Sequence, residues 1–320
     1  MKIDSKIDIQ MTQESGQTSQ PPWKMINNSY CSLIFPNNTP ILLKISQNNI
    51  NSLNITTEFI DSSNEKNNEK KPIEIAIKKK VSEIFNLDFD LDKFYKFLKN
   101  DDKLAPASEF CNGLRLFIAK DPFECIISSI SSANNSILRW TKSIDEIAFN
   151  WGDIYKFKSG TFFSFPKPEV LKDVFETPED ESKYYEKPIN ICLNNLKECG
   201  VGYRSPYILQ TSEKLTNEIA INDFFKMKYD EAYETIIKFK GVGPKVADCI
   251  LLYGFGFMEA FPTDVWIKRI ISHLYFNKKE ITAEKVKDFG MEHYGDYAGY
   301  TQLYLFHYAR KSGLLQKLKK

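Results

Sequence analysis

The sequence lacks the long apolar runs that would place a chain in a membrane or carry it across one. No stretch approaches the roughly 18 uncharged apolar residues of a membrane span. The first 20 residues are polar and hold no apolar signal core, which predicts an intracellular protein. An excess of one charge is also missing, since 43 Lys and Arg stand against 42 Asp and Glu. This balance neither indicates nor excludes a nucleic-acid partner, because a basic footprint can be local.

The chain is also poor in the residues that build metal centres. Its six cysteines form no Cys-x-x-Cys pair, and several lie in apolar runs, so reduced and buried thiols are expected. Histidine occurs at three positions, namely His273, His293 and His307. We therefore expect neither a zinc site nor an iron–sulfur cluster.

What is present divides the chain into three parts. Residues 1–22 are polar with few aromatics and are expected to form a disordered tail. Residues 23–118 hold short apolar runs, "SYCSLIF", "PILLKI" and "IEIAI", separated by breaks rich in Asn, Ser and Pro. This pattern predicts a small antiparallel sheet with a long solvated loop, "DSSNEKNNEKKP".

Residues 119–316 are expected to be nearly all helix. Apolar residues recur at helical spacing from Asp121-Pro122, a start signal, to Gly152, a stop signal. An amphipathic helix, "DLDKFYKFLKN", precedes this part, and "KYDEAYETIIKFKGVGPKVADCILLYGFG" indicates a helix, a tight turn and a helix. The predicted fold class is α+β, with a small N-terminal antiparallel β-sheet domain before a mostly α-helical domain.

The glycine turn of that hairpin carries an unusual lysine. Gly241 and Gly243 flank Val242, and Pro244 suits the first position of the next helix. Such a turn lets backbone N–H groups approach a phosphate. Lys245 follows in the first helical turn, where the helix dipole disfavours a cation and so favours a free, nucleophilic amine. A plain contact to phosphate or solvent is the alternative.

Asp264 raises a similar choice. It follows Pro262-Thr263 and precedes an apolar helix, so the simplest interpretation is a helix N-cap. A cap position also keeps a carboxylate rigid, which is compatible with a catalytic role. Cys249 lies four residues after Lys245 on the same helix face and, taken alone, is expected to be a core thiol.

These residues resemble a known family. "GVGPKVADCI", with the aspartate of "FPTDVWIKRI" nineteen positions after the lysine, is similar to the helix-hairpin-helix (HhH-GPD) DNA glycosylases. Within them the chain resembles the 8-oxoguanine DNA glycosylase/AP lyase branch. The blocks "GLRLFIAKDPFECIISSISSANNSILR", "CGVGYRSPYI" and "YAGYTQLYLFHYAR" resemble that branch in the same order, over about residues 113–310.

The resemblance implies a bifunctional enzyme of base excision repair. Lys245 would attack C1′ of the damaged nucleotide and form a Schiff base, and Asp264 would stabilise the cationic sugar in the transition state. β-Elimination would then cut the strand. The base would have to be flipped out of the duplex. The implied partner is damaged double-stranded DNA, bound by a monomer in the cytoplasm or nucleoid of a prokaryote or the nucleus of a eukaryote.

The same resemblance assigns a pocket and a DNA-binding surface. The pocket for the flipped base would include Cys249, Gln302, Phe306 and Tyr253. The residues expected to contact DNA are Asn134, Arg139, Tyr203, Arg204, Gly241, Gly243, Val246 and Trp266. The carbonyls of Ile237, Phe239 and Val242 would bind a monovalent cation, and no other cofactor is implied.

The chain departs from the family pattern at three places. Trp266 stands where a phosphate-binding histidine is usual, and Ala309 replaces the carboxylate that would orient it. The segment usual in the family, of the form Gly-Gln-x-Phe-Arg-Trp, whose glycine carbonyl distinguishes oxidised guanine, is expected to be absent. Without this segment, the sequence does not specify which damaged base the protein removes.

Two alternatives therefore remain beside an 8-oxoguanine glycosylase. "FNLDFDLDKFYKFL" resembles part of the alkyladenine-type glycosylases, for which Lys245 would be incidental. The second alternative is a non-catalytic protein that only binds DNA, because glycine hairpins of this kind also occur in such proteins. An endonuclease III-type enzyme is disfavoured, because its usual C-terminal cysteine cluster is missing after Arg310.

Overall fold

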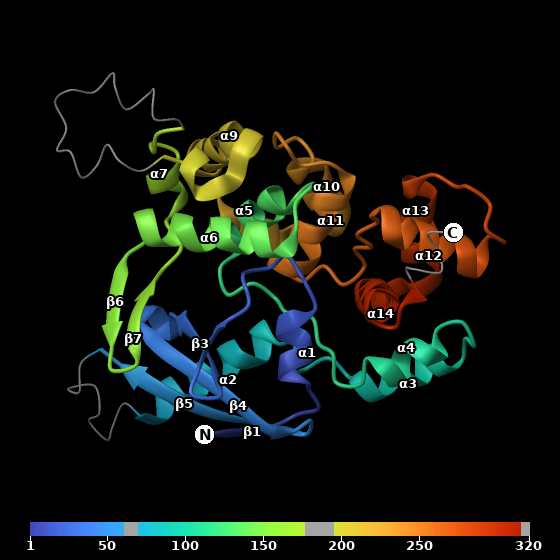
Figure 1. Ribbon diagram of the computed structural model, residues 1–320, viewed down its shortest axis with the longest axis horizontal. Coiled ribbons are helices and arrows are strands. Elements are labelled where there is room, and N and C mark those ends of the chain that lie inside the picture. The colour runs from blue at the N-terminus through green and yellow to red at the C-terminus, as the bar shows by residue number, and fades with distance from the viewer. Residues whose placement is uncertain (61–69, 177–194, 315–320) are drawn as a thin grey trace.

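The computed structural model describes residues 1–60, 70–176 and 195–314. An antiparallel sheet forms one side of the molecule and helices form the rest, which confirms the predicted α+β class (Figure 1). The predicted solvated loop and the helical segment expected around residues 177–194 lie outside, or mostly outside, the described residues. Within the described ranges, no helix is both long and apolar enough to cross a membrane.

The sheet has five antiparallel strands in the order β1-β5-β4-β3-β2. Their bounds are β1 Lys2–Asp4, β2 Lys24–Ile26, β3 Ser29–Ile34, β4 Ile41–Asn49 and β5 Ser52–Phe59. One face packs Ile41, Leu43 and Ile45 against α2 (Lys70–Ile84). The opposite face packs Leu33 and Leu42 against a two-stranded hairpin, β6 (Ile154–Phe157) and β7 (Gly160–Phe163). The sheet is therefore covered on both faces.

Two expectations for this part are wrong. "IEIAI" lies inside helix α2 and not in a strand, because its apolar residues continue at helical spacing to Val81 and Ile84, which are buried. Residues 1–22 do not form a disordered tail. They supply β1 and helix α1 (Ile9–Glu14), and Gln17 is buried with its amide bonded to the backbone of Arg115 and Phe117. The polar residues there satisfy buried backbone groups instead of solvating a tail.

The helical part is built around one core. Its helices, with those that precede it, are α3 Leu91–Lys99, α4 Ala105–Phe110, α5 Pro122–Ser132, α6 Ile137–Trp151, α7 Pro168–Leu171, α9 Ser205–Asn217, α10 Tyr229–Ile236, α11 Pro244–Ile250, α12 Val265–Tyr275, α13 Ala283–Tyr294 and α14 Ala298–Lys311. Aspartate caps begin α3, α5 and α12 as expected, because Asp90, Asp121 and Asp264 each accept a hydrogen bond from a first-turn N–H. The hairpin β6–β7 interrupts the predicted all-helical stretch.

Candidate active site

The glycine turn joins α10 to α11 as the sequence predicts. Gly241 has φ of +82°, which favours glycine, and a Cβ added there would lie 2.4 Å from the ring of Tyr207. The turn can therefore press flat against α9 only with glycine at this position. Gly243 is exposed at the start of α11, and Pro244 occupies the first helical position. Exposed N–H groups at this end suit a phosphate.

Lys245, Cys249 and Tyr253 follow one another at intervals of four along α11 and the π-helical turn Leu251–Phe255 that continues it. The Cys249 thiol lies within hydrogen-bonding reach of Lys245 and of Thr18. Burial raises the pKa of this thiol, and the charge of Lys245 opposes the rise. Burial likewise raises the pKa of Tyr253, with the charges of its neighbours Cys249, Cys125 and Asp264 adding to it. Both groups therefore stay protonated and form an uncharged floor beside the lysine.

Asp264 caps α12 and faces the same floor. Its Oδ1 accepts from the backbone N–H of Trp266 at 2.9 Å and of Ile267 at 2.8 Å. Both bonds end on Oδ1, so the cap role is confirmed and Oδ2 keeps its capacity for a second role. Its charge adds to the raised pKa of Tyr253, so the carboxylate lies in the neighbourhood of the helical run that begins with Lys245. An amine and a fixed carboxylate thus share one site.

Residues 16–18 form another side of the site, which the sequence did not lead us to expect. Gly16 has φ of +86°, and a Cβ there would meet Ile137 Cδ1 and Arg310 Nη1, each at 2.7 Å. At the other end, Thr18 reaches the Cys249 thiol and lies 3.1 Å from the hydroxyl of Ser129. Three consecutive residues thus connect α11 with α14, because they span only about 7 Å.

The sequence does hold a Gly-Gln pair, Gly16-Gln17, and the structure places Gly16 against Arg310 of α14 and the following Thr18 near Cys249. The full form Gly-Gln-x-Phe-Arg-Trp is not present, because "TSQPPW" follows this pair at residues 18–23. The pair was overlooked because it lies in residues 1–22, the stretch interpreted as disorder, with Gly16 seven residues before Trp23. The polar residues around the Gly16-Gln17 pair made it look like part of a solvated tail.

Helix α14 supplies Gln302 and Phe306 one turn apart. Gln302 is buried, and its Oε1 has no hydrogen-bond partner among the described residues. A buried amide oxygen without a partner costs about 1–3 kcal/mol, which is tolerable where a ligand supplies the bond. Phe306 is partly exposed, with the Arg310 guanidinium 5.7 Å from its ring centroid. The predicted recognition amide and stacking ring thus lie on the helix that the Gly16 segment meets.

The two predicted DNA-contact blocks meet at the backbone carbonyl of Ala133. Arg204 is buried, and its guanidinium donates to the carbonyl of Ala133, beside Asn134. Asn134 is exposed with φ of +51° in the loop between α5 and α6, and Arg139 is exposed in the first turn of α6. Tyr203 is also exposed, at 56%. Arg204 therefore supports the loop, while the other three present their side chains outward.

The remaining predicted contacts are placed as follows. Trp266, which stands where the family usually has histidine, is partly exposed. The Arg269 guanidinium lies 5.1 Å from the centroid of its ring and supplies a positive charge there. Ala309 is fully buried on α14. The Phe239 carbonyl accepts from the N–H of Val242 at 3.1 Å, which leaves one lone pair for the predicted cation. Val246 is buried, with its N–H in the first turn of α11.

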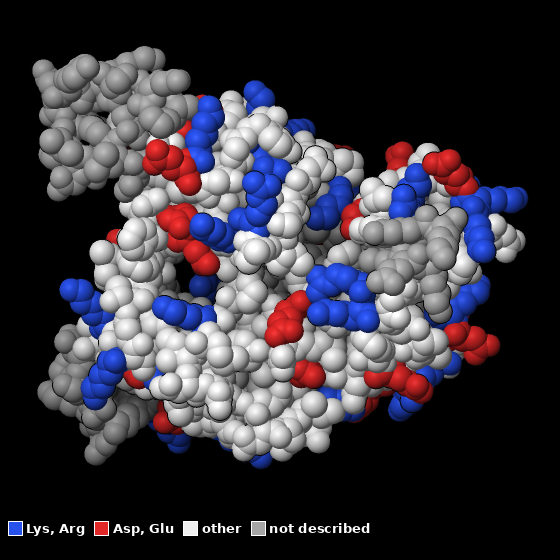
Figure 2. All heavy atoms as spheres, in the orientation of Figure 1, with Lys and Arg blue, Asp and Glu red and all other residues white. Residues whose placement is uncertain are grey.

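Charge is distributed unevenly over this face of the molecule. Lys and Arg lie across the middle of the face in Figure 2, over the region of α6, α10 and α14 in Figure 1, with acidic side chains among them. A local basic footprint is therefore compatible with the net charge of +1.

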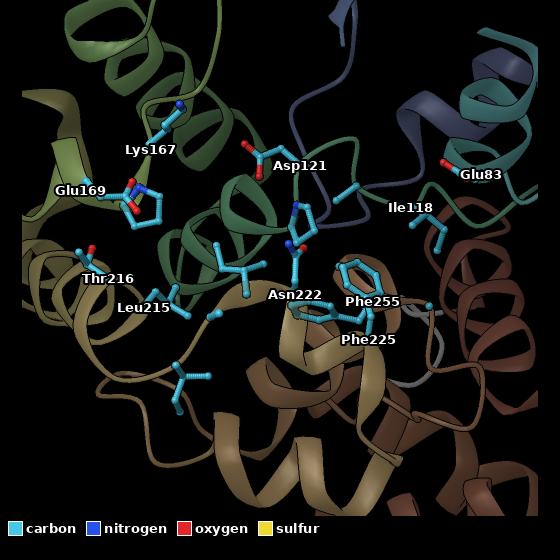
Figure 3. A pocket seen from close by; sticks show the side chains of 18 of the residues that line it. Glu83, Ile118, Asp121, Lys167, Glu169, Leu215, Thr216, Asn222, Phe225 and Phe255 are labelled. Carbon is cyan, nitrogen blue, oxygen red and sulfur yellow. The ribbon is translucent and has the colours of Figure 1, made fainter. Parts of the chain in front are cut away.

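A cavity of about 1100 Å³ lies apart from the site (Figure 3). It is lined by parts of α2, α7, the end of α9 and residues 254–258, with Phe225 and Phe255 side by side on its wall, ring centroids 5.1 Å apart. None of its lining residues is among those predicted to contact DNA or the base. The cavity is therefore distinct from the site that the predicted residues form.

Comparisons with known proteins agree with this geometry. Residues 1–126 match the family described as "8-oxoguanine DNA glycosylase, N-terminal domain", and residues 127–294 match "HhH-GPD superfamily base excision DNA repair protein". The chain belongs to the HhH-GPD superfamily of base excision DNA repair proteins. The first of the two matches includes Gly16-Gln17.

Three relatives illustrate how far the similarity extends. A "Probable N-glycosylase/DNA lyase" of Methanothermobacter thermautotrophicus is 43% identical over 318 residues, which cover 98% of this chain and 96% of that protein. An "N-glycosylase/DNA lyase" of Saccharomyces cerevisiae is 29% identical over 72% of this chain and 66% of that protein. The structure of a Clostridium acetobutylicum 8-oxoguanine glycosylase/lyase with DNA containing cytosine opposite 8-oxoguanine has 28% identity and a TM-score of 0.76, and covers 97% of this chain and 93% of that one.

Proposed function

We propose that the protein removes 8-oxoguanine paired with cytosine from double-stranded DNA and then cleaves the strand as an AP lyase. The observation that carries this is the shared site of Lys245 and Asp264, at a floor formed by Cys249 and Tyr253. A monofunctional glycosylase needs the carboxylate alone, whereas a Schiff base needs the amine as well. The named activities of the relatives support the same conclusion.

The chemistry follows from these two groups. As the glycosidic bond breaks, positive charge develops on the sugar, and the fixed Asp264 carboxylate stabilises it. The free amine of Lys245 bonds to C1′ and the base departs with a proton. The imine that forms acidifies the neighbouring sugar carbon, so loss of a proton there expels the 3′ phosphate. The strand is thereby cut while the enzyme is still covalently attached.

Base recognition would involve the segment of residues 16–18 and helix α14, together with Cys249. 8-Oxoguanine carries a hydrogen on N7, where guanine has a lone pair, so a carbonyl acceptor distinguishes the two. The Gly16 carbonyl would be that acceptor, and Gln302 would read the base edge. Cys249 and Phe306 would cover the two faces of the base. Asn134, Arg139 and Tyr203 would occupy the gap left in the duplex and contact the opposite cytosine.

Borohydride trapping on a duplex with 8-oxoguanine opposite cytosine tests the function. The wild-type protein should form a covalent adduct with the DNA, and Lys245→Gln should form none. Lys238→Gln, an exposed lysine in the same hairpin, serves as the matched control and should keep the adduct. Release of alkylated purines by the wild type without an adduct would establish the alkylpurine alternative instead. Binding without base release would establish a DNA-holding protein.

We further propose that the protein acts as a monomer on DNA inside the cell, with a monovalent cation at the carbonyls of Ile237, Phe239 and Val242. This cation site is supported by the Phe239 carbonyl, which accepts one hydrogen bond and so has a lone pair left for a cation. Replacing K⁺ by the larger tetramethylammonium ion at constant ionic strength should weaken DNA binding if the cation bridges hairpin and phosphate. Equal affinity in the two salts would contradict the cation site.

A further inference from the structure

Arg310 connects two walls of the base site that lie far apart in the sequence. It stands in the last turn of α14, one turn after Phe306. Its Nη2 donates to the backbone carbonyl of Glu14 at 2.8 Å, across 296 positions of sequence. Its guanidinium lies 5.7 Å from the ring of Phe306. One side chain therefore contacts both the predicted stacking ring and the turn that leads into Gly16.

The end of α1 explains why an arginine suits this place. Glu14 is the last residue of α1, so its carbonyl has no partner within the helix and lies at the negative end of the helix dipole. A guanidinium provides several donors in a fixed plane and stays charged when partly buried. Burial lowers the pKa of Arg310, and the nearby charge of Glu14 opposes the decrease. The bond thus replaces water at a helix end beside the pocket.

Gly16 depends on this contact for its position. A Cβ at Gly16 would lie 2.7 Å from Arg310 Nη1 and the same distance from Ile137 Cδ1, so the turn is held tightly between the two side chains. At its other end, Thr18 is held against α5, because its hydroxyl lies 3.1 Å from that of Ser129 and its carbonyl accepts from the Cys125 thiol. Removing the guanidinium frees one end of the segment and leaves the other attached.

We propose that Arg310 is a positioning residue for base discrimination, because it holds the Glu14–Gly16 turn against Phe306 and so fixes the recognition carbonyl relative to the stacking ring. This inference rests on the proposed function. It concerns the base alone, since among the described residues neither Arg310 nor Glu14 is hydrogen-bonded to Lys245 or Asp264. Arg310 should therefore control which base is released and leave the chemistry at the sugar unchanged.

A comparison of two substrates tests the proposal. One duplex carries 8-oxoguanine opposite cytosine, and the other carries a preformed abasic site, which needs no base pocket. Arg310→Met keeps the apolar stem and loses the bond to the carbonyl of Glu14. Single-turnover release of 8-oxoguanine should fall about tenfold or more, as expected for the loss of one charged hydrogen bond. Cleavage at the abasic site should stay within about twofold, and the preference for 8-oxoguanine over guanine should decrease.

Three further measurements decide among the explanations. Arg310→Lys, which can still donate one hydrogen bond, should recover part of the lost base release. Lys311→Met, an exposed neighbour on α14, should behave as the wild type on both substrates. Equal losses on the two substrates would overturn the proposal in favour of a DNA contact or a general folding defect, which a thermal melt separates. Unchanged base release would also overturn it. If the wild type acts on neither substrate, the proposed function fails and not this inference.

Discussion

At the scale of single residues, the observed cap geometry of Asp264 is compatible with its proposed catalytic role. Its Oδ1 satisfies two backbone N–H groups at the start of α12. Those bonds hold the carboxylate in a fixed position, which is what stabilisation of a transient cation requires, because a preorganised charge need not reorient during the reaction. The observed cap and the proposed catalytic role would therefore use the same geometry.

Substitutions at Asp264 can separate the two uses. Asparagine caps helices about as well as aspartate, so Asp264→Asn should keep the stability of the protein while base release falls roughly 10²–10³-fold. Asp264→Ala should lose base release and, in addition, about 1 kcal/mol of stability. Single-turnover base release and urea unfolding measure the two quantities. Full base release by the asparagine variant would contradict a catalytic role.

At the scale of elements, a buried aspartate links helix α11 to helices α10 and α13. Asp248 accepts from the hydroxyl of Tyr229 on α10 and pairs with Lys287 of α13 at 3.1 Å. Burial raises the pKa of Asp248, and Lys287 opposes the rise. The ammonium also lies 3.5 Å from the ring centroid of Tyr233. The short helix that carries Lys245 is thus anchored to two neighbouring helices.

Loss of the cation should destabilise this anchor strongly. Lys287→Met leaves the Asp248 carboxylate buried without its partner, and we expect a loss of about 3–5 kcal/mol in the free energy of unfolding. Adding Asp248→Asn should recover part of this loss, because the uncompensated charge is then removed. Urea unfolding at neutral pH measures both, with Lys285→Met, exposed on the same helix, as the control. A cost below about 0.5 kcal/mol would show that the pair is not an anchor.

At the scale of the whole molecule, the sheet and the helical part meet at a buried acid. Glu124 of α5 is 5% exposed and lies 3.7 Å from Lys120, whose ammonium also donates to the hydroxyl of Ser32 on β3. Burial raises the pKa of Glu124 to about 7, with the charge of Lys120 opposing the rise and those of Asp121 and Asp145 adding to it. The junction is therefore sensitive to pH near neutrality.

The direction of the pH effect follows from the raised pKa. Between about pH 4.5 and 7 the folded protein binds the Glu124 proton more tightly than the unfolded chain, so the contribution of Glu124 to stability decreases as pH rises through this window. Glu124→Gln mimics the protonated form. It should make the protein roughly 1–3 kcal/mol more stable at pH 8 and flatten the pH dependence. Urea unfolding of both proteins from pH 5 to 8 checks this, and identical profiles would contradict it.

Features with local causes were predictable from the sequence. Helix caps at Asp90, Asp121 and Asp264 depend on the few residues that follow each of them. The glycine turn before Lys245 is similarly local. The β6–β7 hairpin was missed although Lys158-Ser159-Gly160 is a turn signal, because apolar residues on either side were interpreted as helix. Its tip is held by contacts of Ser159 with Glu58 of the sheet, which no local pattern specifies.

The sequence by itself determined the chemistry, an amine at a helix start and a carboxylate at a helix cap, since both depend on neighbouring backbone. Only the tertiary structure decided what surrounds them. Residues 1–22 look like a solvated tail until burial gives their polar side chains backbone partners, and Arg310 is an ordinary surface residue until the Glu14 carbonyl reaches it. Contacts across hundreds of residues form only when the whole core orders the chain, because loop closure of that length is unfavourable on its own.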